Sequence, residues 1–131
     1  IASSMAAEIY GARILKKGIE DDRQNYTRFF LAQRPGDKPL IKPVGEKKTS
    51  LVFTTRNTPG ALFRALSAFA LRDLSLEKIE SRPLRGKPWE YLFYVDVLAD
   101  LEDEKTKRAL GHLEELADFL KVFGCYPKAA S

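Results

Sequence analysis

Residues 89–97 have the sequence Trp-Glu-Tyr-Leu-Phe-Tyr-Val-Asp-Val, in which a large apolar side chain occupies every second position. The odd-numbered residues would share one face of a sheet, because successive side chains of a strand alternate between its two faces. The even-numbered positions mix acidic residues with Leu92 and Tyr94, so the second face is less apolar but not clearly solvated. The segment predicts a strand with one face on a hydrophobic core.

The residues around this strand predict three further strands and two helices. They are a strand over 49–55, a helix beginning near Pro59, a strand over 74–82, a helix over 103–117 and a strand over 119–126. Thr58 is expected to cap the first helix and Pro59 to occupy its first position. The alternation slips between Leu76 and Ile79, which indicates a β-bulge.

The order of these elements is βαββαβ, which predicts the α+β class. Right-handed crossovers place both helices on one face of a four-stranded antiparallel sheet, the ferredoxin-like arrangement. The inward helical faces would hold Leu62, Ala65, Leu66 and Phe69 on the first helix, and Leu110, Leu113 and Leu116 on the second. The other face of the sheet has no helix of its own, so we expect another subunit or domain to cover part of it.

The first 48 residues differ from this pattern. Ala2, Met5, Ala6 and Ile9 follow helical spacing, and the aromatic and β-branched residues of 25–32 predict a strand. Proline, glycine and charged residues then break any regular structure over 34–48. We therefore expect an end portion of one domain at 1–33, a linker at 34–48 and a second domain at 49–131.

The composition limits the classes of function. The net charge is +4, but Arg34, Lys38, Lys42, Lys47 and Lys48 against Asp37 and Glu46 place +3 of it in residues 34–48. A nucleic-acid site would more often form a stripe on a folded face. A single Cys125 and a single His112 leave no internal disulfide and no cluster for zinc. We therefore expect no metal, no cofactor and no nucleic-acid partner. We also expect no membrane partner, because no apolar run reaches the roughly 18 residues of a membrane span.

The two ends of the chain also give expectations. The first residues lack the charged start and apolar run of a secretory signal, which indicates a reducing compartment. The chain begins with Ile1 and not with Met, and its first residues have the spacing of a helix interior. We therefore interpret it as a piece of a longer protein.

Two clusters contain residues suited to binding an amino acid. In the first, Gly60 and Ala61 at a helix N-terminus would let a carboxylate approach free backbone N–H groups. The alternative is an ordinary turn between strand and helix. In the second, Glu80, Ser81 and Arg82 could hold an ammonium and a carboxylate by charge-assisted hydrogen bonds. Its alternative is a solvated strand end with a local ion pair.

Four motifs occur in a fixed order: Asn-x-Pro-Gly-Ala-Leu at 57–62, Leu-x-x-Phe-Ala at 66–70, Lys-Ile-Glu-Ser-Arg-Pro at 78–83 and Trp-Glu-Tyr-x-Phe-Tyr-Val-Asp at 89–96. Residues 49–127 thereby resemble the ACT regulatory domain of prephenate dehydratases. The resemblance implies a phenylalanine site between two ACT domains, formed by Asn57, Pro59, Gly60, Ala61, Leu62, Glu80, Ser81, Arg82 and Pro83. Phe63 replaces the aliphatic residue expected after Gly-Ala-Leu, which changes the shape of the side-chain pocket.

A third cluster, Thr27-Arg28-Phe29, follows Ile1-Ala2-Ser3-Ser4-Met5-Ala6-Ala7, and both resemble the end of the catalytic domain of that family. Members of that family are lyases that convert prephenate to phenylpyruvate with loss of carbon dioxide and water. The resemblance implies catalytic roles for Thr27, Arg28 and Phe29. Thr27 would donate a hydrogen bond to the departing hydroxyl, and Arg28 would anchor the segment or neutralise charge. The chain alone is expected to be inactive, because the family's other active-site motifs are absent.

The resemblance also implies partners and a location. L-phenylalanine would act as effector, prephenate would be the substrate of the full-length enzyme, and ACT domains would form a homodimer or homotetramer. The protein would be cytoplasmic, or in the plastid of a plant. Two alternatives stay open: the regulatory part of an arogenate dehydratase, and an RNA-binding βαββαβ domain, which Glu90 and Asp96 among the aromatic residues disfavour. The effector could also be another apolar amino acid.

Overall fold

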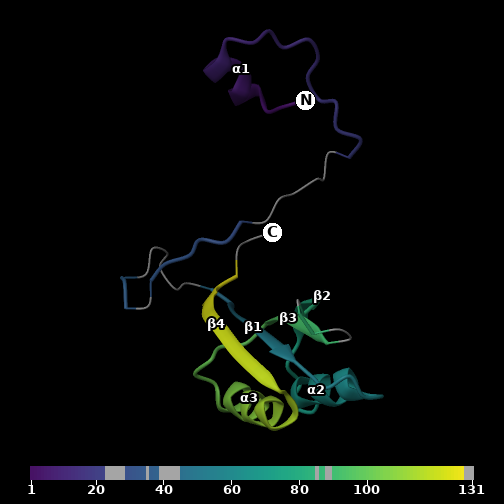
Figure 1. The fold of residues 1–131 in the computed structure, drawn as a ribbon. Helices are drawn as coiled ribbons and strands as arrows, with labels where there is room; N and C mark the ends of the chain where they lie inside the picture. The colour runs from purple at the N-terminus through teal and green to yellow at the C-terminus, as the bar shows by residue number, and fades with distance from the viewer. Residues whose placement is uncertain (23–28, 35, 39–44, 85, 88–89, 129–131) are drawn as a thin grey trace. The chain divides into compact units, whose positions relative to one another are not determined.

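The computed structural model describes residues 1–22, 29–34, 36–38, 45–84, 86–87 and 90–128 (Figure 1). The chain divides into two units, residues 1–37 and residues 38–131. Of the residues on which the sequence predictions rest, Thr27, Arg28, Lys42, Trp89 and residues 25–26 of the predicted strand lie outside the described ranges.

The first unit contains one helix, α1 (Ser4–Tyr10), among its described residues. Gly11 ends α1 with a left-handed φ of 60°, and the helix predicted from the spacing of Met5, Ala6 and Ile9 is confirmed. The predicted strand at 25–32 is wrong for its described part, because residues 29–32 belong to no strand and the Phe29 side chain is 85% exposed. A strand requires a neighbour to pair its backbone groups, and the described residues of this unit include none.

The second unit contains the expected six elements. They are β1 (Lys47–Thr54), α2 (Ala61–Ala70), β2 (Leu76–Pro83), β3 (Tyr91–Val97), α3 (Glu104–Leu116) and β4 (Phe119–Pro127). The strands form one sheet in the order β2-β3-β1-β4, and every neighbouring pair is antiparallel. The predicted ferredoxin-like βαββαβ fold is therefore confirmed.

One face of the sheet forms the core with α2 and α3, which lie side by side in Figure 1. Leu51 and Phe53 of β1 project onto this face, and the Phe53 ring stacks on Phe93 with centroids 5.4 Å apart. Ala65 and Phe69 of α2 and Leu113 of α3 are fully or almost fully buried against them, as predicted. The burial of Ala68, Thr106 and Ala109 was not predicted.

Two irregularities adjust the strand pairing. The register of β2 against β3 shifts between Leu76 and Lys78, which confirms the predicted bulge. A second shift, which the sequence analysis missed, occurs in the pairing of β1 with β4 between Ser50 and Leu51. Phe123 of β4 lies beside this shift and stacks on Tyr94 of β3, with ring centroids 6.3 Å apart.

The opposite face of the sheet carries a buried polar network around Lys48 of β1, which is only 6% exposed. Its Nζ lies 3.0 Å from Glu77 Oε2, 3.3 Å from Asp96 Oδ2 and 5.6 Å from the centre of the Tyr126 ring. Ser50 Oγ donates to Asp96 Oδ1 at 2.5 Å, and the Ser50 and Tyr126 hydroxyls form a hydrogen bond of 2.5 Å. These contacts join all four strands.

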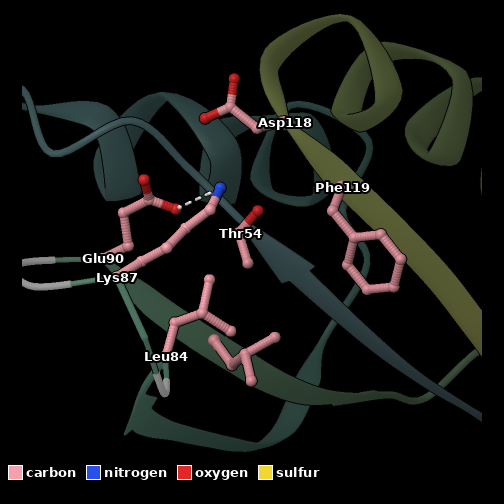
Figure 2. A pocket seen from close by; sticks show the side chains of 7 residues that line it. Thr54, Leu84, Lys87, Glu90, Asp118 and Phe119 are labelled. Atoms are coloured by element: carbon pink, nitrogen blue, oxygen red, sulfur yellow. Dashed lines mark ion pairs between the residues drawn. The ribbon is translucent and has the colours of Figure 1, made fainter.

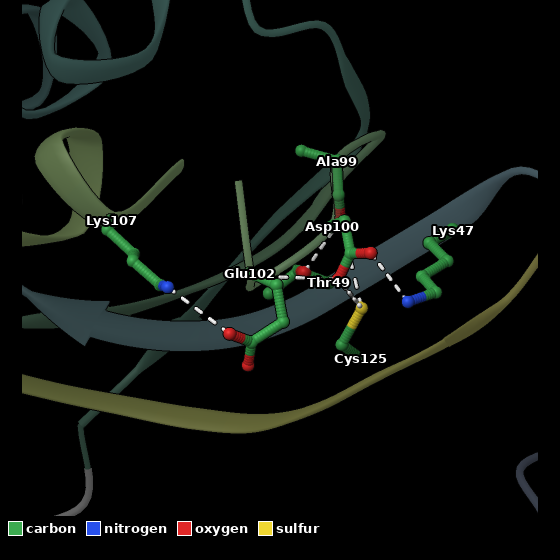
Figure 3. Close-up of polar contacts among 7 residues, drawn as sticks. All are labelled: Lys47, Thr49, Ala99, Asp100, Glu102, Lys107 and Cys125. Carbon is green, nitrogen blue, oxygen red and sulfur yellow. Dashed lines mark hydrogen bonds and ion pairs between the residues drawn. The ribbon is translucent and has the colours of Figure 1, made fainter. Parts of the chain in front are cut away.

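Figure 3 shows a second polar cluster where the turn after β3 meets the beginning of β1. Lys47 Nζ lies 2.5 Å from Asp100 Oδ2, and Thr49 Oγ1 donates to the Ala99 carbonyl at 2.8 Å. The Lys47–Asp100 pair raises the pKa of Lys47 and lowers the pKa of Asp100. Cys125 Sγ lies 3.7 Å from Asp100 Oδ1. The cluster ties the 98–103 turn to β1.

No helix in the described part of the chain is both long enough and apolar enough to cross a membrane. Among the same residues no group of three or more His, Cys, Asp or Glu side chains is placed to hold a metal ion.

Replacing Phe53 by Ala should strongly destabilise the second unit, because the fully buried Phe53 ring contributes to the core from the central strand. We expect the free energy of unfolding to fall by about 3–5 kcal/mol. Phe63→Ala is the matched control, since Phe63 is 77% exposed and its removal should change stability by less than about 0.5 kcal/mol. Urea unfolding followed by circular dichroism measures both, and equal losses would contradict the assignment of Phe53 to the core.

Glu77 should make stability depend on pH at acid values. Hydrogen bonds from Lys128 and then from Lys48 lower the pKa of Glu77 from 4.5 to about 2. Because the folded-state pKa lies below the unfolded-state value, the stabilisation is complete above about pH 4.5 and is lost as the pH falls towards 2. The difference in unfolding free energy between the wild type and Glu77→Gln should shrink over this range.

Lys128→Met provides the control for that measurement. It removes the largest cause of the lowered Glu77 pKa, so the pH dependence of the Glu77→Gln difference should be weaker in this background. If the difference in unfolding free energy between the wild type and Glu77→Gln stays constant from pH 6 to about pH 2, the two lysines do not stabilise the Glu77 carboxylate.

Candidate functional site

The two segments predicted to bind an amino acid, residues 57–62 and residues 80–83, lie at the same edge of the sheet. β1 and β2 both run antiparallel to β3, so they are parallel to each other. Leu92 of β3 pairs with Thr54 on one side and with Arg82 on the other. The ends of β1 and β2 are therefore separated by one intervening strand, which corresponds to roughly 10 Å.

The N-terminus of α2 is built from a glycine turn. Gly60 is the N-cap and has a left-handed φ of 75°, and Ala61 is the first helical residue. The prediction that Thr58 caps the helix and Pro59 occupies its first position is wrong. The left-handed φ of 75° at Gly60 explains the difference, because it interrupts the helical backbone between Pro59 and Ala61. The Arg64 guanidinium also donates to Thr58 Oγ1 at 3.1 Å and to the Pro59 carbonyl at 3.2 Å.

This arrangement leaves donors at the start of α2. The Ala61 N–H donates to the Thr58 carbonyl at 3.0 Å, whereas the described part of the chain provides no side-chain cap for the helix. N–H groups in a first helical turn carry partial positive charge and suit an anionic ligand. The Arg64 guanidinium adds a full positive charge beside them. A carboxylate is the group that this end of α2 is best suited to accept.

The second segment is dominated by local ion pairs. The Glu80 carboxylate pairs with Arg82 and with Lys78, the latter at 2.6 Å. Arg82 Nη1 also donates to the Ser81 carbonyl at 2.9 Å, and Ser81, Arg82 and Pro83 are exposed. Within one copy, Glu80 is thus flanked by two cations. This arrangement agrees with the alternative given for this segment, a solvated strand end with a local ion pair.

The structure also contains a pocket that the sequence analysis did not predict. It has a volume of about 550 Å³ and is lined by Thr54, Leu84, Lys87, Glu90, Leu92, Asp118 and Phe119 (Figure 2). None of the predicted site residues that the structure describes lines it. These residues come from three strands and two connecting segments, and only the register of the strands brings them together. The alternating sequence of β3 was the one sequence signal for this pocket, because it places Leu92 on the face of the sheet without helices.

Comparisons with known proteins agree with this architecture. Residues 49–115 match the family model of the ACT domain. The chain belongs to the ACT domain family. Residues 1–37 of this ACT protein match the prephenate dehydratase family model, so the resemblance drawn from the sequence motifs is confirmed in both parts.

The relatives of this ACT protein are longer enzymes. It is 48% identical over 137 residues to arogenate dehydratase/prephenate dehydratase 2, chloroplastic, of Arabidopsis thaliana, covering 97% of this chain and 35% of the relative. The chain thus spans about a third of the length of that relative.

Two solved structures share the fold. A prephenate dehydratase in complex with L-Phe from Arthrobacter aurescens is 32% identical, with a TM-score of 0.61, over 72% of this chain and 31% of that chain. A protein described as GqqA, a novel type of quorum quenching acylase, is 31% identical, with a TM-score of 0.64, over 73% of this chain and 48% of that chain.

Gly60→Ala should destabilise the unit, because an Ala side chain is strained at the φ of 75° that the N-cap of α2 requires. We expect a loss of about 1–2 kcal/mol in unfolding free energy. Gly111→Ala is the matched control. Gly111 lies inside α3 with open space at its Cβ position, so the change should stabilise the unit by about 0.4–1 kcal/mol. Thermal unfolding of the two variants should shift in opposite directions, and shifts in the same direction would contradict this account of the Gly60 turn.

Proposed function

We propose that this chain is the regulatory part of a prephenate or arogenate dehydratase and that its ACT domain binds L-phenylalanine for feedback control of the parent enzyme. The observation that carries the proposal is the position of the uncapped α2 N-terminus and of Glu80, Ser81 and Arg82 at one edge of the sheet. The family matches support the class of enzyme, and the related Arthrobacter protein is described as a complex with L-Phe.

The chemistry of the two segments assigns them complementary tasks. The α2 N-terminus accepts the carboxylate of the ligand, with Asn57, Pro59, Gly60, Ala61 and Leu62 forming the surrounding loop and first turn. Glu80 accepts hydrogen bonds from the ammonium group, and Ser81, Arg82 and Pro83 complete that side of the site. The ion pairs of Glu80 are partly exposed, so the ligand can replace them at small cost.

The positions of the segments in one copy favour a site shared by two copies. The ammonium and the carboxylate of an α-amino acid are attached to the same carbon atom. In one copy β3 separates the ends of β1 and β2 by roughly 10 Å, and Glu80, which pairs with Tyr94, lies on the face of the sheet opposite α2. A second ACT domain could bring its own Glu80 next to the α2 N-terminus of the first. We therefore propose a homodimer, or a homotetramer built from dimers, as the assembly.

The first unit fits the end of a catalytic domain. We assign residues 1–33 to that domain, 34–48 to a linker and 49–131 to the regulatory domain. Thr27, Arg28 and Phe29 would act in the parent enzyme, a lyase that removes carbon dioxide and water from prephenate or arogenate. Thr27 would donate a hydrogen bond to the leaving hydroxyl. The protein would work in the cytoplasm, or in a plastid as the name of the Arabidopsis relative indicates for that protein.

Calorimetric titration of the chain with L-phenylalanine tests the proposal, with L-tyrosine and L-tryptophan as competing effectors. L-phenylalanine should bind most tightly, and Glu80→Gln should weaken binding by about tenfold or more because a charged acceptor of the ammonium is lost. Glu104→Gln is the matched control, since Glu104 is exposed in the first turn of α3, at the end of the sheet opposite both segments, and it should bind like the wild type. Equal affinities of the wild type and Glu80→Gln would exclude Glu80 from the site.

A further inference from the structure

The pocket beside the end of β1 has an apolar floor on the face of the sheet that carries no helix. Thr54 of β1 pairs with Leu92 of β3 on one side and with Phe119 of β4 on the other, so these three side chains form a row across the sheet. Leu84, in the connection after β2, completes the apolar lining. Figure 2 shows Leu84 and the Phe119 ring on opposite sides of the pocket. Phe119 is 48% exposed, so a ligand could still cover a large part of the ring.

The rim of the pocket carries charges of both signs. Lys87 Nζ lies 3.3 Å from Glu90 Oε2, and Arg56 Nε lies 3.3 Å from the Asp118 carboxylate. Lys87, Asp118 and Arg56 are exposed, and ion pairs of this kind contribute about 0–1 kcal/mol each. A zwitterionic ligand can therefore pair with Lys87 through its carboxylate and with Glu90 or Asp118 through its ammonium.

The walls of the pocket are tied to the sheet by backbone hydrogen bonds. The Leu84 N–H donates to the Glu90 carbonyl at 2.9 Å, which closes the connection between β2 and β3. The Asp118 N–H donates to the Thr54 carbonyl at 3.1 Å, which fixes the start of β4 against the end of β1. These bonds fix the backbone of two walls of the pocket, and its volume of about 550 Å³ suits a small molecule.

We propose that this pocket binds a free α-amino acid with an apolar side chain within a single copy of the chain. The apolar side chain would lie against Leu84, Leu92 and Phe119, and the ammonium and carboxylate would pair with the charged rim. This site shares no residue with the two-copy site of the proposed function and requires no second subunit. The two sites can therefore be occupied independently, and an experiment can disprove one proposal without the other.

Nuclear magnetic resonance of the 131-residue chain titrated with L-phenylalanine tests the proposal. The amide signals of Thr54, Leu92 and Phe119 should shift along a saturable curve. Lys87→Glu should weaken this binding by about tenfold or more, because it removes the partner of the carboxylate and adds a third negative charge to the rim. Lys105→Glu makes the same change of charge at an exposed position of α3 outside the pocket, and it should leave the curve unchanged.

Two further ligands test which groups are recognised. 3-Phenylpropionate lacks the ammonium and 2-phenylethylamine lacks the carboxylate, so each should bind more weakly than L-phenylalanine. Shifts confined to residues 57–62 and 80–83 would overturn the pocket proposal while supporting the proposed function. Shifts confined to the pocket residues would support the pocket proposal and contradict the proposed effector site. Pocket shifts that Lys87→Glu leaves unchanged would exclude recognition of the ligand carboxylate by Lys87 and would overturn the proposal.

Discussion

Burial of β1 on both of its faces is the constraint on which the rest of this unit depends. β1 lies between β3 and β4, and its apolar side chains Leu51 and Phe53 meet the two helices. Its other face places Lys48 and Ser50 under side chains from the three other strands. A charged side chain buried in this way is tolerated only with charged or hydrogen-bonding partners, because desolvating an unpaired ammonium costs several kcal/mol. The partners of Lys48 thus restrict the register of every strand in the sheet.

That register also determines where ligands can bind. Leu92 pairs with both Thr54 and Arg82, so the segments that follow β1 and β2 leave the sheet at one edge. The same pairing places Leu92 beside Thr54 and Phe119 in the floor of the pocket. One edge of the sheet therefore carries both proposed sites. In one copy Glu80 lies on the sheet face opposite α2, whereas the proposed pocket has charges of both signs within a copy.

The sequence predicted what depends on local periodicity. Alternation in β3 and helical spacing in α2 and α3 identified the elements and most of the core, because each signal lies within one segment. The predicted start of α2 was wrong because the left-handed φ of Gly60 moves the first helical position to Ala61. Lys48 was counted as linker charge, although its partners lie on other strands, far along the chain. The pocket escaped prediction for the same reason, since strand pairing alone brings Thr54 and Phe119 together.

The two ends of the sheet differ in how easily they can respond to a ligand. At the start of β1, the network around Lys48 is buried, and breaking such a pair by removing one partner costs about 3–5 kcal/mol. At the end of β1, the ion pairs of Arg82, Lys87 and Arg56 are exposed and individually weak. A ligand changes a conformational equilibrium only through its different affinities for the two states. A bound amino acid can therefore replace these exposed ion pairs at small cost, while the buried network keeps the strands in register. We expect a regulatory response from the proposed sites to depend on these exposed pairs and not on sliding of the strands.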